Sequence, residues 1–226
     1  MRPTTSSFVF HFHRVGNWQW VLDHVGYTLQ LSGTTLYIAL VSVAVGLVLS
    51  VGLGVLAVRA RGAAPPILGL TTFIYALPSL AAFGLLLSLT GLSDTTVIIP
   101  LAGYSLAILV RSVIDGLGSV PDDVRTSAAA MGYRPLRRLL TVELPAAVPV
   151  IIGGLRVATV SSISLSTVGA LVGIGGLGTL FTTGEDNNFL TEIILGVVVV
   201  AFWALVCDGL LLLGGRLLAP WARRGR

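Results

Sequence analysis

Long runs without a single charged residue are the feature that most constrains the fold of this chain. Residues 34–58, 62–93, 95–110, 157–184 and 193–207 contain no Asp, Glu, Lys or Arg. A helix of about 20 apolar residues crosses the hydrocarbon core of a bilayer. Only 11% of the residues are charged, whereas soluble domains carry about a quarter. The sequence therefore predicts an all-α, polytopic membrane protein.

Five membrane spans are expected, at about residues 34–58, 66–90, 95–114, 147–168 and 190–214. Pro78 lies in the middle of the second span and predicts a kink or break there. Residues 1–33 are interpreted as an N-terminal extracytoplasmic or interfacial segment, and residues 34–217 as the transmembrane domain. Within that domain residues 115–145 form a cytoplasmic segment, and residues 218–226 are a basic tail.

The arginines give the expected orientation in a cell membrane. All 14 basic residues are Arg. Placing residues 115–145 and the C-terminus in the cytoplasm collects 11 of them on that side, leaves two outside (Arg2 and Arg14) and puts Arg156 in a span. Arginines that flank spans favour the cytoplasmic side, so the N-terminus is expected outside and the C-terminus inside. The basic charge is accounted for in this way, without a nucleic-acid partner.

Residues 173–178 spell the glycine pattern of a dinucleotide-binding fold, G-x-G-x-x-G. That function needs a preceding strand and a βαβ unit, whereas these glycines follow a membrane span on its predicted outer side. An NAD site is therefore not expected. Two interpretations remain open, a small-residue face for helix packing and a bent outer loop beside a transport pathway.

The cytoplasmic segment "VRTSAAAMGYRPLRRLLTVELPAAVP" (124–149) differs from an ordinary loop. Pro121 and two acidic residues suit a helix start, and Gly132 is a natural helix end. Pro135 can begin a second short helix over residues 135–143, and Pro145 and Pro149 mark entry into the fourth span. The pattern predicts two short helices that meet at a glycine and form a compact cytoplasmic projection.

This segment resembles the signature loop of permease subunits of ATP-binding-cassette importers, which reads Glu-Ala-Ala, three residues, Gly, nine residues, an aliphatic residue, any residue and Leu-Pro. Gly132, Val142, Leu144 and Pro145 match that spacing. The Glu-Ala-Ala positions hold Thr126, Ser127 and Ala128, so the acidic residue of the signature is missing.

Together with "IYALPSLAAFGLLL" (74–87) and "VGALVGIGGLGTLFTTG" (168–184), the chain is similar to the osmoprotectant branch, which takes glycine betaine, choline or carnitine. The resemblance implies a permease for such quaternary amines, paired with a second permease, a cytoplasmic ATPase dimer and an extracytoplasmic solute-binding protein. ATP and Mg would be bound by the ATPase, and this chain would bind no cofactor. The residues implied to couple to the ATPase are Arg125, Thr126, Ser127, Ala128, Ala129, Gly132, Tyr133, Val142, Leu144 and Pro145.

Other functions are less consistent with the residues. The chain has no P-loop, and its three His all precede the first span, so it is not expected to be an enzyme. A secondary transporter would show repeats and more intramembrane charges, and a channel would not explain the spacing from Gly132 to Pro145. A related permease for an amino acid such as methionine remains an alternative. His11 and His13 alternate without a third ligand, so no metal site is expected.

Aromatic, hydroxyl and glycine residues of the spans are candidates for a translocation pathway or gate, with helix packing as the alternative. They are Tyr75, Pro78, Ser79, Ser161, Ser164, Gly173, Gly175, Gly176 and Gly178, and, more weakly, Tyr104, Ser162 and Ser166. Arg156 lies about 10 Å inside the fourth span, counted from Pro149 at about 1.5 Å per residue. Asp208 reaches a similar depth on the fifth span and is its expected partner. Asp115 and simple extension of Arg156 to the interface are the alternatives.

Overall fold

The computed structural model describes residues 18–60 and 62–219, and every regular element in these ranges is helical. The elements, in chain order, are α1 (Trp18–Asp23), α2 (Val25–Arg59), α3 (Ala64–Ala76), α4 (Ser79–Thr90), α5 (Thr95–Gly118), α6 (Asp122–Ala130), α7 (Pro135–Arg138), a π-helical turn η1 (Leu139–Glu143), α8 (Leu144–Ser166), a 3₁₀ turn η2 (Thr167–Val172), α9 (Thr179–Asp186) and α10 (Leu190–Leu218).

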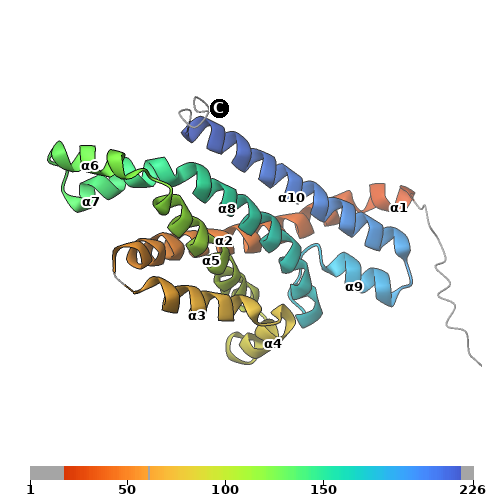
Figure 1. Ribbon diagram of the computed structural model, residues 1–226. Helices are drawn as coiled ribbons and strands as arrows, with labels where there is room; N and C mark the ends of the chain where they lie inside the picture. The colour runs from red at the N-terminus through yellow and green to blue at the C-terminus, as the bar shows by residue number, and fades with distance from the viewer. Residues whose placement is uncertain (1–17, 61, 220–226) are drawn as a thin grey trace, which may run out of the picture.

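The long helices run between two distinct ends of the molecule (Figure 1). Helices α6 and α7 project from one end, and α1 and α9 lie at the other. Below, the projection formed by residues 121–143 is called the knob, and the two ends are called the knob end and the far end. Four segments of the described chain are long and apolar enough to span a membrane alone, and these are 25–59, 95–118, 135–172 and 190–218.

Helices α3 and α4 together qualify as a fifth candidate span that is broken in the middle. Arg59, the last residue of α2, donates from its guanidinium to the Pro135 carbonyl at 2.8 Å, which fixes the end of α2 at the knob. The next long helix, α5, begins at the far end, where Leu92 lies beside Gly173. The chain between them must therefore travel from one end to the other. It does so as two helices bent by 89°.

The bend is a complete helix break at Pro78. The residue before a proline is disfavoured in the α region, and Leu77 and Pro78 are both extended, with ψ of 132° and 128°. The break frees carbonyls at the end of α3, and the Tyr104 hydroxyl donates to the Leu77 carbonyl at 3.0 Å. The break predicted at Pro78 is confirmed, and its cost is offset by a side chain from α5.

Helix α5 forms the centre of the bundle, with α2 on one side and α8 on the other. Its buried side chains Val97, Leu101 and Tyr104 pack with Ile38 of α2 and Phe83 of α4. Small residues let α2 and α5 approach closely, and a Cβ built on Gly46 would lie 2.8 Å from the Ser105 Cβ. Such contacts between small residues are the usual means of helix association in membranes.

The glycine-rich segment is an irregular turn between η2 and α9. Gly173 and Gly176 have φ of +79° and +120°, conformations that residues with a Cβ rarely adopt. The Leu177 N–H donates to the Thr35 hydroxyl of α2 at 2.8 Å, so the turn is tied to the first long helix. The described elements on either side of it are helical.

Several helix boundaries differ from the predicted spans, by two to nine residues. Helix α2 begins at Val25 rather than at residue 34, because Leu31 is buried against Leu177 and Leu180. The third and fifth long helices each extend four residues further than predicted, to Gly118 and Leu218, and the fourth covers Leu144–Ser166 instead of 147–168. The second short helix of the knob is not separate, since α7 continues through η1 into α8.

The glycine turn predicts a contrast between two alanine substitutions. A Cβ at Gly178 would overlap the carbonyl of Thr167, whereas nothing lies within 4 Å of a Cβ at Gly175. Overpacking costs about 1–3 kcal/mol, so Gly178→Ala should lower the unfolding temperature of the detergent-purified protein and Gly175→Ala should not. Equal unfolding temperatures for the two variants would contradict this packing.

Candidate functional site

The knob is a helix–turn–helix unit closed by Gly132. The N–H of Tyr133 donates to the Ala128 carbonyl (3.1 Å) and that of Gly132 to Ala129 (3.0 Å), which ends α6. Gly132 has φ of +81°, the left-handed conformation that glycine adopts without strain. Pro135 then begins α7 as a first-turn proline. The two helices meeting at a glycine are therefore present as predicted.

Two arginines fasten the knob to the membrane helices, and a third forms an ion pair within the knob. Arg125 donates to the Leu117 carbonyl at the end of α5, and Arg59 donates to the Pro135 carbonyl. Arg138 pairs with Glu143 at 2.7 Å, and the Glu143 side chain is only 7% exposed. Arg125 was expected among the residues that face a partner, but its side chain is turned towards its own chain. The knob is therefore hydrogen-bonded to α5 and α2, and its second helix continues into α8.

The other residues predicted for coupling differ in exposure. Thr126, Ser127, Ala129 and Gly132 are exposed, Tyr133, Val142, Leu144 and Pro145 are half-buried, and Ala128 is buried inside the knob. The Arg137 guanidinium lies over the Tyr133 ring at 4.9 Å from its centroid, which orders the turn after Gly132. The exposed members lie mainly on α6.

Exposed apolar side chains of the knob were missed by the sequence analysis. Met131, Leu136 and Leu140 are 68%, 64% and 56% exposed. Met131 directly precedes Gly132, and Leu136 and Leu140 follow Pro135, so in an amphipathic pattern they read as core residues. The buried positions of the knob are taken by Ala128, Leu139 and Glu143 instead. Three large apolar side chains on one projection form a candidate docking surface.

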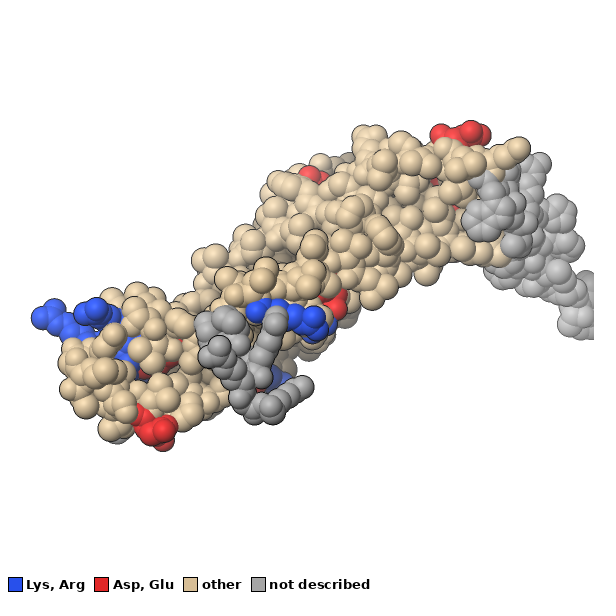
Figure 2. Space-filling view, turned by 90° about the horizontal axis from the view of Figure 1, so that it is seen from above, with Lys and Arg blue, Asp and Glu red and all other residues tan. Residues whose placement is uncertain are grey.

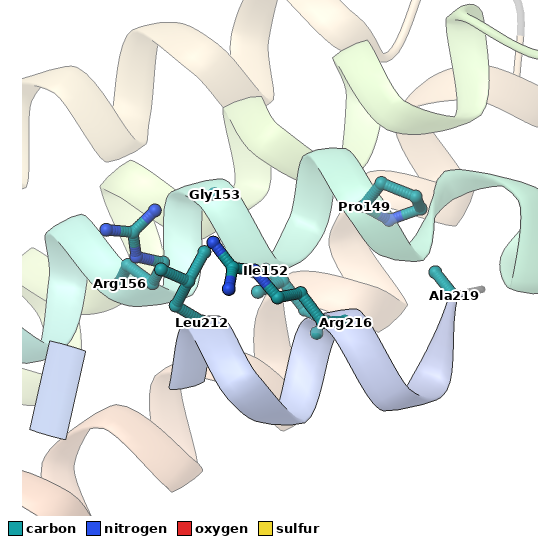
Figure 3. A pocket seen from close by; sticks show the side chains of 8 residues that line it. Pro149, Ile152, Gly153, Arg156, Leu212, Arg216 and Ala219 are labelled. Carbon is teal, nitrogen blue, oxygen red and sulfur yellow. The ribbon is translucent and has the colours of Figure 1, made fainter. Parts of the chain in front are cut away.

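Arg156 and Asp208 form a bidentate ion pair between α8 and α10. The Arg156 Nε and Nη2 atoms each donate to one carboxylate oxygen of Asp208 at 2.7 Å. The predicted partner, Asp208, is therefore confirmed. The two alternatives, pairing with Asp115 and an unpaired Arg156, are wrong. The pair fastens α10, the most peripheral of the long helices, to the rest of the bundle. Figure 3 shows Arg156 and Arg216 lining the groove between α8 and α10.

The predicted pathway residues do not all lie together. Tyr75 lines a groove of about 490 Å³ between α3, α5 and α8. Val157 of that groove, Ser161 and Ser164 follow one another at helical spacing, so they share one face of α8. Ser164 and Pro78 are exposed, and Ser79 and Ser161 are half-buried. Of the four glycines, Gly173 and Gly175 are exposed, whereas Gly176 and Gly178 are buried in packing contacts.

Three weaker pathway candidates are buried instead. The Ser162 hydroxyl bonds the Ser105 hydroxyl at 3.0 Å between α8 and α5, and Ser166 bonds the carbonyl of Ile163 in its own helix at 2.7 Å. Tyr104 is the hydrogen-bond donor at the Pro78 break. These side chains serve packing because they lie on the inner faces of their helices.

Two charged residues of the groove were missed as site residues. Arg111 and Asp115 lie one helical turn apart on α5 and both line the groove beside Tyr75. In the sequence they mark the end of the third span, and their shared face was not noticed. No cluster of three or more His, Cys, Asp or Glu side chains occurs within residues 18–60 and 62–219. His11 and His13 lie outside the described residues.

The bundle has four long apolar helices and a fifth candidate span that is bent. With an irregular turn at one end and a firmly attached projection at the other, it has the architecture of a membrane transport permease. Residues 46–224 match the model of the family described as "binding-protein-dependent transport system inner membrane component". The chain belongs to this family.

Curated relatives match nearly the whole chain. The chain is 34% identical over 197 residues to the osmoprotectant import permease protein OsmW of Salmonella typhimurium strain LT2, which covers 85% of this chain and 92% of that protein. It is 32% identical over 207 residues to the choline transport system permease protein OpuBB of Bacillus subtilis strain 168, which covers 88% and 95%.

Solved structures agree with the fold. The crystal structure of an amino acid ABC transporter with histidines superposes with a TM-score of 0.73 at 16% identity, covering 90% of this chain and 99% of that chain. The methionine ABC transporter MetNI in an inward-facing conformation gives 0.70 at 19% identity, covering 91% and 98%. At these identities the likeness supports the fold of an importer permease.

The ion pair predicts non-additive losses of stability. Arg156→Gln and Asp208→Asn should each destabilise the protein, because either leaves a charge without its partner on a helix that can span the membrane. The double variant should lose less than the sum of the two, by about 0.5–3 kcal/mol. Unfolding of the purified protein gives the four free energies of the cycle. Asp94→Asn, at the exposed start of α5, is the matched control, and strict additivity would contradict the pairing.

Proposed function

We propose that this chain is the permease subunit of an ATP-driven importer that moves a small osmoprotectant, such as glycine betaine, choline or a related quaternary amine, into the cell. It works with a second permease subunit, a cytoplasmic ATPase dimer and an extracytoplasmic solute-binding protein. ATP and Mg are bound by the ATPase subunits. The substrate class is taken from the names of the two relatives. The match to this chain covers 92% and 95% of their lengths.

The observation that carries the coupling role is the apolar surface of the knob. Met131, Leu136 and Leu140 are more than half exposed on a unit that stands outside the bundle. Exposed apolar side chains that are not needed for the fold favour a protein partner. In the proposed complex an ATPase cleft receives this surface. The knob that carries the surface is attached to α5 through Arg125 and to α2 through Arg59. Movement of the ATPase would therefore reach the pathway helices directly.

Exposed Thr126, Ser127 and Ala129 on α6 lie on the same projection and belong to the proposed contact. The acidic residue that the family signature places at position 126 is replaced by Thr, so a salt bridge from this position is not part of the proposal. The apolar surface supplies the contact instead, with Gly132 setting the angle between α6 and α7.

The proposed orientation places the knob end in the cytoplasm, with the N-terminus outside and the C-terminus inside. On the face seen in Figure 2, the arginines of the described residues lie at the knob end and near the middle of the molecule, while acidic side chains also occur at the opposite end. An excess of arginine on one side favours the cytoplasm for that side. Five crossings then put the two termini on opposite sides.

The docking proposal predicts that Leu136→Asp abolishes uptake. The side chain is exposed, so the variant should insert and unfold like the wild type, while a charge on the docking surface opposes burial against the ATPase. The assay is uptake of labelled glycine betaine or choline by proteoliposomes that contain the permease, its ATPase and the binding protein, with co-purification of the ATPase as second readout.

The matched control is Leu136→Met, which keeps an apolar side chain of similar volume and should retain uptake. Leu136→Asp that binds the ATPase and transports normally would contradict the coupling role of this surface. Wild-type uptake of neither quaternary amine, with uptake of methionine instead, would contradict the proposed substrate class and leave the coupling result intact.

The proposed orientation predicts which residues a membrane-impermeant maleimide reaches from outside the cell. Cys207 is the only cysteine, so Cys207→Ser provides a cysteine-free background. In that background Glu185→Cys, at the far end, should be labelled in intact cells, and Thr126→Cys, on the knob, only after permeabilisation. The reverse pattern would invert the orientation, and labelling of both sites in intact cells would contradict a membrane crossing by α8.

A further inference from the structure

The groove between α3, α5 and α8 contains two opposite charges within the membrane domain. Its volume is about 490 Å³, and its polar lining comes from Arg111, Asp115, Ser112, Thr72 and Tyr75. The remaining lining residues are apolar or glycine. Few precisely placed polar groups in an otherwise apolar concavity are typical of small-molecule sites.

These two charges differ from the other charged side chains of the long helices. Arg156 and Asp208 satisfy each other, Arg59 donates to the Pro135 carbonyl, and Glu192 accepts from the Thr183 hydroxyl.

Arg216, the remaining charged residue of α10, is likewise not without an interaction partner. Arg111 and Asp115 form no side-chain hydrogen bond or ion pair with any residue in the described ranges 18–60 and 62–219, and both are exposed to the groove. Both lie on α5, which is long and apolar enough to span a membrane, and ionisable groups on such a helix that have no structural partner indicate a functional site.

The spacing of the two charges suits a small zwitterion. Residues four apart on a helix lie on one face, about 6 Å apart along the axis. The planar guanidinium of Arg111 can bind a carboxylate through two hydrogen bonds. A quaternary ammonium has no N–H to donate, so it is held by a carboxylate such as Asp115 and by aromatic faces. The Tyr75 ring, which meets Tyr104 edge-on with centroids 6.1 Å apart, supplies such a face on the same groove.

Glycine on the opposite wall keeps the groove open. Gly153 of α8 lines it, and nothing lies within 4 Å of a Cβ built there. A larger side chain at this position would therefore occupy groove space without straining the helix packing. The neighbouring Gly154 is different, because a Cβ there would overlap the Ser112 side chain.

We propose that this groove is a substrate site within the permease itself, in which Arg111 binds the carboxylate and Asp115 the quaternary ammonium of a zwitterionic solute such as glycine betaine. The inference rests on the proposed function, since it concerns the route of the same substrates. It assigns selectivity to the permease in addition to the binding protein. Choline, which has the ammonium but no carboxylate, should use Asp115 and not Arg111.

The test measures uptake of labelled glycine betaine and of labelled choline by the complete complex of permease, ATPase and binding protein in proteoliposomes. Loss of a charge-assisted bidentate contact should weaken betaine uptake by about tenfold or more. Arg111→Gln should therefore lower betaine uptake selectively and leave choline uptake within about threefold of the wild type. Asp115→Asn should lower both, and so should Gly153→Leu by filling the groove.

Controls separate binding from folding. Arg111→Lys keeps the positive charge but loses the planar group that binds a carboxylate through two hydrogen bonds. Its betaine uptake should therefore lie between those of the wild type and Arg111→Gln. Asp94→Asn should behave as wild type. Stimulation of ATP hydrolysis by the binding protein should persist in Arg111→Gln, which a merely structural loss would not allow. Labelled betaine should also bind the permease–ATPase complex without the binding protein, and tert-butylacetate, which replaces the ammonium by carbon, should compete poorly.

Equal effects of Arg111→Gln on betaine and choline uptake, or no effect on either, would overturn the inference while wild-type uptake of both solutes upholds the proposed function. Absence of betaine binding to the complex without its binding protein would also overturn it. A wild-type complex that takes up neither solute would contradict the proposed function and, with it, this site.

Discussion

The hydrocarbon core of a membrane offers no hydrogen-bond partners, so each backbone group that leaves a helix must be satisfied within the protein. At the Pro78 break and at the glycine turn, a side chain from a neighbouring helix forms a hydrogen bond with a backbone group that lies outside regular helix. At the Pro78 break the Tyr104 hydroxyl donates to the Leu77 carbonyl. At the glycine turn the Thr35 hydroxyl accepts from the Leu177 N–H. The donors and acceptors come from α5 and α2, which are packed together along most of their length. The central helix pair therefore determines where the chain is free to depart from helical structure.

Charged groups follow the same logic. Burying a charge in the membrane is costly unless an opposite charge offsets it, and Arg156 and Asp208 meet this condition with two short hydrogen bonds. The pair contributes to holding α10 in place, which a surface salt bridge in water would do only weakly. Arg111 and Asp115 remain unsatisfied by any described residue and face a groove. The contrast separates charges that fasten helices from charges that are available to a solute, and it depends on partners rather than on depth.

The knob combines rigid attachment with an apolar outer surface. Arg125 and Arg59 connect it to α5 and α2, and the π-helical turn η1 continues it into α8 without a break. A flexible loop with the same apolar residues could bind a partner but would absorb its movement. Here the exposed Leu136 stands on an element that is continuous with a helix lining the groove. Binding at one end can therefore displace the helices that form the proposed pathway.

The amino-acid sequence by itself determined which segments become membrane helices, the break at Pro78, and the two-helix knob around Gly132. These features depend on local properties, namely apolar runs of sufficient length, the missing N–H of proline and the conformational freedom of glycine. Tertiary structure alone decided that Arg156 pairs with Asp208 and not Asp115, that Arg125 turns inward, and that Arg111 and Asp115 share an open groove. It also decided that η1 joins the knob to α8 and that Gly176 and Gly178 are packed rather than exposed. Those outcomes depend on which helix faces meet, and contacts between residues far apart in the chain set that geometry.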